Sequence, residues 1–103
     1  MKLDINSNVN FDGQVNRGIL GPQQERVFNT VRSTLSDIMK DSKYDLFVAQ
    51  ERKYPNSYFN QHVKFSLWTP NSRHKLPNDY VEVYEHKPES WIKKLKELMA
   101  KQS

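Results

Sequence analysis

The side chains in this sequence best suited to acid–base chemistry or metal binding are its three histidines, His62, His74 and His86. Imidazole titrates near neutral pH and is a common zinc ligand. A zinc centre needs at least three protein ligands, but the chain contains no cysteine and no HExxH sequence. Antiparallel strand pairing is expected to bring His62 near His86, and two imidazoles are too few. The sequence therefore predicts no metal site and no cofactor.

Other catalytic signatures are missing from the sequence as well. It has no GxSxG nucleophile motif, no phosphate-binding glycine loop and no helix-borne pair of carboxylates at matched spacing. Small ribonucleases can cleave RNA with scattered His, Lys, Arg and Tyr side chains, all of which occur here. A metal-independent ribonuclease toxin is therefore one hypothesis. A non-catalytic binding protein is favoured over it, and no residue is assigned a catalytic role.

The net charge of +4 is concentrated in the second half of the chain. Residues 1–51 carry six Lys or Arg against seven Asp or Glu, whereas residues 52–103 carry ten against five. An anionic partner would therefore be attracted mainly by the second half. The candidate binding residues in predicted loops are Arg52, Lys53, Tyr54 and Lys87 at one end of the sheet, and Arg73 and Lys75 at the other.

Two kinds of apolar periodicity predict the elements that must position these side chains. A period of two is typical of strands, and a three-four spacing is typical of helices. The apolar run from Leu46 to Ala49 predicts a well-covered central strand. Residues 8–21 fit a strand, a hairpin or a loop. Strands are expected within residues 3–11, 44–51, 59–68 and 80–86, and helices over residues 22–41 and from Pro88 onward.

This order of elements predicts an α+β fold with the sequence β-α-β-β-β-α. Both amphipathic helices are expected to pack on one face of an antiparallel sheet. A chain of 103 residues forms a single domain, residues 1–103, because two halves would be too small to bury separate cores. The predicted core consists of Phe28, Val31, Leu35, Leu46, Val48, Val63, Phe65, Val83, Ile92, Leu95 and Leu98.

The sheet face opposite the helices is the predicted binding surface. If the apolar residues of strand 59–68 face the helices, the alternate residues of this strand and the next face away. RNA bases stack on exposed rings while Lys and Arg meet phosphates, so such a face suits RNA. The same aromatics suit a protein-binding module such as a phage-type inhibitor, an immunity protein or an assembly protein. The residues concerned are His62, Lys64, Ser66, Trp68, Tyr80, Glu82 and Tyr84.

Three segments, together with the order of elements, resemble the ribosome hibernation-promoting factors. They are the opening Met1–Ile5 (MKLDI), the stretch Lys43–Val48 (KYDLFV) after the first helix, and Trp91–Leu98 (WIKKLKEL) near the end. The resemblance implies a β-α-β-β-β-α domain that docks on the small ribosomal subunit. RNA or the ribosome is then the expected partner, with another protein as the alternative.

The sequence also bears on location. No segment approaches the length and apolarity of a membrane span, so no membrane partner is expected. The first residues, Met1–Asn6, lack the apolar run of a secretory signal. We therefore expect a cytoplasmic protein.

Overall fold

The computed structural model describes residues 13–52, 61–69 and 76–102. The strand expected within residues 3–11 lies outside these ranges, as do four of the candidate binding residues, Lys53, Tyr54, Arg73 and Lys75. For Arg52 the strand pairing is described, and the side chain is not.

The described elements follow the predicted α+β order. They are β2 (Val15–Arg17), α1 (Pro22–Met39), β3 (Asp45–Arg52), β4 (Gln61–Trp68), β5 (Asp79–Val83) and α2 (Pro88–Ala100). The four strands form one sheet in the order β2-β3-β4-β5. The pairs β3–β4 and β4–β5 are antiparallel, but β2 runs parallel to β3. The expectation of a purely antiparallel sheet is wrong at this edge, because α1 is a crossover that lets β3 run in the same direction as β2.

Residues 8–21, which the sequence allowed to be a strand, a hairpin or a loop, contain β2. Its pairing with β3 extends past the three strand residues, since the N–H of Gly18 donates to the carbonyl oxygen of Val48 at 2.8 Å. Gly13, two residues before β2, lies where the backbone passes very close to the end of α1 and the start of β3. A Cβ added at Gly13 would lie 2.4 Å from the carbonyl oxygens of both Met39 and Tyr44. Only a residue without a side chain fits between the end of α1 and the start of β3.

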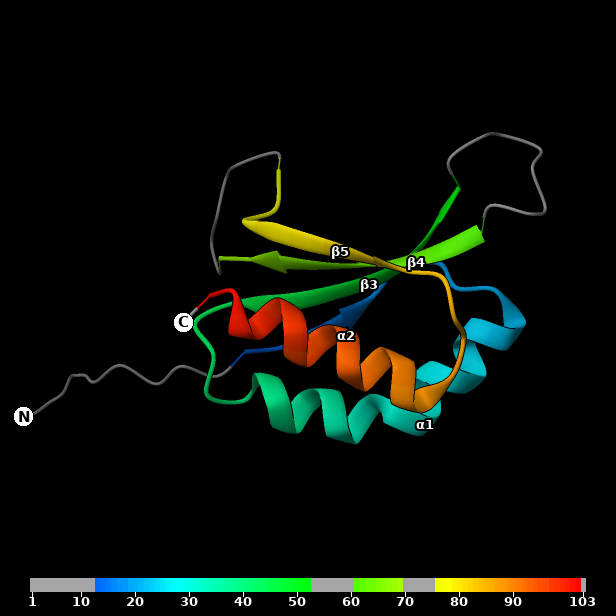
Figure 1. Cartoon of the computed structure of the whole chain (residues 1–103), viewed down its shortest axis with the longest axis horizontal. Helices are drawn as coiled ribbons and strands as arrows, with labels where there is room; N and C mark the ends of the chain where they lie inside the picture. The colour runs from blue at the N-terminus through cyan, green and yellow to red at the C-terminus, as the bar shows by residue number, and fades with distance from the viewer. Residues whose placement is uncertain (1–12, 53–60, 70–75, 103) are drawn as a thin grey trace, which may run out of the picture.

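Both helices lie on one face of the sheet, as predicted (Figure 1). They pack against each other, and α2 also packs along β5. Every residue of the predicted core is buried except Ile92, which is half-buried at the edge of the core. Neither helix in the described part of the chain is long and apolar enough to cross a membrane. The core consists of Val27, Phe28, Val31, Leu35, Met39, Leu46, Val48, Val63, Phe65, Leu67, Val83, Trp91, Leu95 and Leu98.

Trp91 is the side chain that fixes α2 to the sheet. It is fully buried and meets the ring of Phe65 edge-on, with ring centroids 5.5 Å apart. Its indole N–H donates a hydrogen bond to the carbonyl oxygen of Glu85 at 3.0 Å. A buried tryptophan needs such a partner for its polar edge. The helix is therefore held by both apolar packing and a polar contact.

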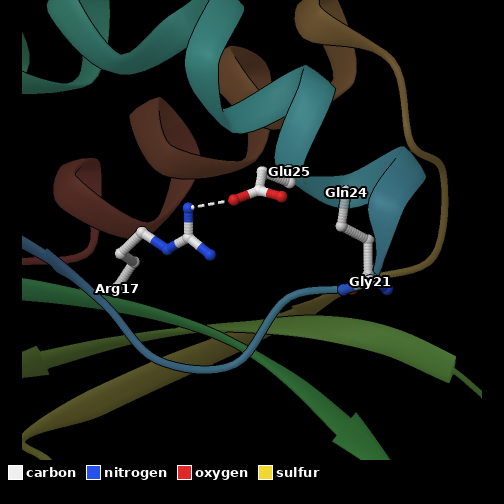
Figure 2. Close-up of polar contacts among 4 residues, drawn as sticks. All are labelled: Arg17, Gly21, Gln24 and Glu25. Atoms are coloured by element: carbon white, nitrogen blue, oxygen red, sulfur yellow. Dashed lines mark hydrogen bonds and ion pairs between the residues drawn. The ribbon is translucent and has the colours of Figure 1, made fainter.

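Polar contacts fix the start of α1 over the edge strand (Figure 2). Pro22 occupies the first turn, where its missing N–H costs nothing. The side chain of Gln24 accepts a hydrogen bond from the N–H of Gly21 at 2.8 Å, which satisfies one backbone donor at the helix start. Arg17 of β2 forms an ion pair with Glu25 at 2.8 Å. The β2–α1 connection is thus anchored at both of its ends.

Candidate binding face

The sheet face opposite the helices is built from alternate residues of all four strands. Antiparallel pairing sets Ser66 between Phe47 of β3 and Tyr80 of β5 in one row. The next row along the strands places Lys64 beside Glu82. We call this surface the open face. It consists of Asn16, Asp45, Phe47, Ala49, Glu51, His62, Lys64, Ser66, Trp68, Tyr80, Glu82 and Tyr84.

Large aromatic side chains are exposed on the open face. Tyr84 is 63% exposed, Tyr80 is 50% exposed and Phe47 is 38% exposed. Trp68 is half-buried beside them. Phe47 was expected inside a well-covered strand, and the structure overturns this, because its two neighbours Leu46 and Val48 take the helix-facing positions. Exposed aromatics gathered on one surface are typical of an interaction site.

Two hollows indent the open face around Phe47 and Trp68. The first has a volume of about 310 Å³ and includes Asn16 and Asp45 in its lining. The second has a volume of about 240 Å³ and includes Ala49, Lys64 and Ser66 in its lining. Phe47 and Trp68 line both. These two rings therefore form the walls between adjoining depressions, each of which can receive one side chain of a partner.

Gly18 makes room for the Phe47 ring at the edge of the sheet. A Cβ at this position would lie 2.8 Å from Cζ of Phe47 and 3.1 Å from Cβ of Ala49. Any larger residue would displace the ring. The relation of Gly18 to Phe47 depends on the parallel pairing of β2 with β3.

Lys64 lies on the open face, and its ammonium group contacts an aromatic ring and a carboxylate of the same face. Nζ lies 4.4 Å from the ring centroid of Tyr80, within cation–π range, and 3.9 Å from Oε2 of Glu51. Three carboxylates share the described part of this face with Lys64, those of Asp45, Glu51 and Glu82. The described part of the open face is therefore aromatic and acidic, where the sequence predicted an aromatic and basic surface.

His62 occupies the open face but is almost completely buried, at 1% exposure. Its ring packs on Tyr84 with centroids 4.8 Å apart, and Nε2 lies 3.7 Å from Oε2 of Glu82. His62, which the sequence placed among the candidate binding residues, is thus covered in this conformation. The Tyr84 ring and the Glu82 carboxylate lie beside the imidazole on this face, a crowding that strand alternation cannot reveal.

Tyr84 and Glu82 form a short polar contact on this surface. The phenol donates a hydrogen bond to Oε2 of Glu82 at 2.6 Å. This hydrogen bond raises the pKa of Tyr84, and burial together with the charges of Glu82 and Glu51 acts in the same direction. Ionisation of the phenol would place a second negative charge beside the carboxylate and lose the donated proton.

Of the remaining candidate binding residues, the structure describes Lys87 and the strand pairing of Arg52. Lys87 is exposed and directly precedes α2. Arg52 pairs with Gln61, at the same end of the sheet as Tyr84. The sequence was expected to bring His86 near His62; in the structure the His86 ring packs against Trp91 with centroids 6.4 Å apart, and the His62 ring packs on Tyr84. The two histidines therefore belong to different clusters.

No family model, curated protein or solved structure matches the chain at a significant level.

Proposed function

We propose that this chain is a non-catalytic binding protein that docks on another protein through the open face. The surface it fits has an apolar centre, which enters the two hollows, and lysine or arginine side chains at its rim. The observation that carries the proposal is the exposure of Phe47, Tyr80 and Tyr84 on a face whose described charges are mainly acidic.

The aromatic side chains suit the centre of such an interface. Binding energy concentrates in a few large, rigid side chains that become fully desolvated, and aromatics predominate among them. Phe47 and Trp68 already line hollows, so a partner side chain placed there would contact apolar surface on two sides. The hydrogen bond of Tyr84 and the cation contact of Tyr80 hold both rings in place, which lowers the entropy lost on binding.

The charges favour a protein over RNA as the partner. RNA binding draws much of its affinity from lysine and arginine side chains that replace the counterions of phosphates. On the described open face, Lys64 lies beside Glu51 and opposite Glu82, and Asp45 adds a third carboxylate. These carboxylates would repel phosphates and attract a cationic rim. RNA is accordingly the alternative that the experiment must be able to detect.

The buried state of His62 bears on the ribonuclease hypothesis. An acid–base group must come within hydrogen-bond reach of the substrate proton that it transfers. An imidazole that is 1% exposed lacks that access in this conformation. The site supports binding better than catalysis.

The proposal is tested by capturing partners from an extract of the source cells with the tagged full chain, with and without nuclease. The double variant Phe47→Ser, Tyr80→Ser removes two exposed rings of the open face. Leu76→Ser is the matched control, because Leu76 is also an exposed apolar residue (76%) but lies outside the open face.

We expect one protein to be retained after nuclease treatment by the wild type and by Leu76→Ser, and to be lost from the double variant. Loss of all captured material on nuclease treatment would instead identify RNA as the partner. Retention of the protein by the double variant would show that another surface is responsible.

A further inference from the structure

Three potential metal ligands converge at one end of the open face. Glu51 of β3 lies directly opposite His62 of β4, and Glu82 of β5 lies diagonally across from His62. One ligand atom from each of these residues can be chosen so that all three lie within 4.8 Å of one another. The cluster therefore combines one imidazole nitrogen and two carboxylates on adjacent strands.

From this geometry we propose that Glu51, His62 and Glu82 bind a divalent transition-metal ion, with zinc as the metal of best fit. Imidazole favours zinc and its neighbours in the first transition row, whereas magnesium and calcium prefer all-oxygen sites. Three protein ligands with solvent in the fourth position form a common type of zinc site. Ligand atoms around tetrahedral zinc lie about 3.4 Å apart, so the observed cluster needs to close by only a small rotation of the two partly exposed carboxylates.

The state of Glu51 gives independent support for a cation at this point. Its Oε2 is inaccessible to solvent and accepts no hydrogen bond from the described residues. The Lys64 ammonium lies 3.9 Å from this oxygen, which is too far for a hydrogen bond. Burying a carboxylate oxygen that accepts no hydrogen bond costs free energy unless a nearby cation compensates the negative charge. A metal ion between Glu51 and Glu82 would supply that compensation.

The surroundings of the cluster suit a bound ion in two further ways. Stacking against Tyr84 holds the His62 ring in place, and the Tyr84 hydroxyl donates to Glu82 and orients its carboxylate. Such outer contacts typically raise metal affinity about 10–100-fold. Lys64 competes for Glu51, but its ammonium also lies over the Tyr80 ring, which offers it a place when the metal arrives.

The proposed metal is not required for the fold. The core lies on the helix-covered face, and the cluster lies on the other face. Chelator treatment should therefore leave the fold intact, while added zinc should raise the melting temperature by binding to the native state alone. The inference goes beyond the proposed docking function and does not depend on it, because the docking test removes Phe47 and Tyr80 and leaves the three ligands in place.

The test is isothermal titration of zinc chloride into the full chain after chelator treatment and buffer exchange, with magnesium chloride as the comparison. We expect one zinc per chain and no comparable magnesium binding. Glu51→Gln and Glu82→Gln should each weaken zinc binding at least tenfold, and Tyr84→Phe should weaken it by about tenfold. Lys64→Gln should strengthen it, because a competing cation is removed. The histidine controls His74→Gln and His86→Gln should bind zinc like the wild type.

His62→Gln should abolish binding, and circular dichroism checks that this variant of a buried residue still folds. If it does not fold, the two carboxylate variants decide the question, since both residues are partly exposed. Absence of a stoichiometric zinc site in the wild type would overturn the proposal. So would zinc binding that survives both carboxylate substitutions, or that disappears in His74→Gln or His86→Gln.

Discussion

The two faces of the sheet differ sharply although the same strands build both. On β4 the alternate residues Val63, Phe65 and Leu67 face the helices and are fully buried. The other alternate residues of β4, His62, Lys64, Ser66 and Trp68, carry an imidazole, an ammonium group, a hydroxyl and an indole on the open face. The helix-covered side of β4 is apolar and contributes stability through burial. In the described part of the chain no helix lies over the other face, where side chains contact one another.

This difference shows that an uncovered sheet face can still be closely packed. His62 and Ser66 of the open face are both buried although they face away from the helices. Tyr84 and Tyr80 are exposed, but each contacts a charged or polar group that holds its position. The open face is therefore a preorganised aromatic and acidic surface, which is suited to recognition. The helix-covered face supplies the stability that this arrangement requires.

The largest expected effect lies on the helix-covered face. Phe65→Ala removes a fully buried ring that packs against Trp91, and it should lower the free energy of unfolding by about 3–5 kcal/mol. Urea denaturation followed by circular dichroism measures this change. Ser66→Ala, on the next residue, is the control for the open face. Equal losses from the two substitutions would contradict the division of roles between the faces.

A smaller effect is expected from the same residue type on the open face. Phe47→Ala removes a ring that is 38% exposed and has no helix above it, so the free energy of unfolding should fall by about 1 kcal/mol or less. The same denaturation assay applies. A loss as large as that of Phe65→Ala would mean that the open face also supplies stability.

Gly18→Ala should displace the Phe47 ring and weaken partner binding with little loss of stability.

The smallest effect concerns the pKa of Tyr84, which the hydrogen bond to Glu82 raises above its ordinary value of 10.0. A raised pKa in the folded state contributes stability that is present below pH 10 and is lost as the pH rises through the folded-state value. NMR titration of the Tyr84 ring in chelator-treated protein measures it. Glu82→Gln should lower this pKa toward that of an ordinary tyrosine. An unchanged value would show that Glu82 is not its main cause.

The fold was largely predictable because its longest elements have clear periodicity. The stripe that includes Val27, Val31 and Leu35 predicted α1, and the alternation around Phe65 predicted β4 together with its buried side. The parallel pairing of β2 was not predictable, because a three-residue strand carries no periodic signal and its partner is chosen by backbone hydrogen bonds. The antiparallel expectation failed for this reason.

The candidate site was predictable only as a set of residues on one face. Alternation placed Lys64 and Trp68 opposite the helices, but it could not show that Lys64 lies against an acid or that His62 is buried. Phe47 was missed because an apolar run has no polar residue to mark the exposed side. The approach of Glu51 and Glu82 to His62 follows from strand register, which local spacing along the chain does not encode.

The central claim is that the aromatic side chains of the open face bind a protein. It is tested most directly by measuring the affinity of the captured partner for Phe47→Ala, Tyr84→Ala and Lys64→Ala over a range of salt concentrations. We expect each aromatic substitution to weaken binding at least about tenfold at every salt concentration, with Lys64→Ala close to wild type. A dominant loss from Lys64→Ala, together with a steep fall of affinity with salt, would contradict the account and indicate a nucleic acid partner.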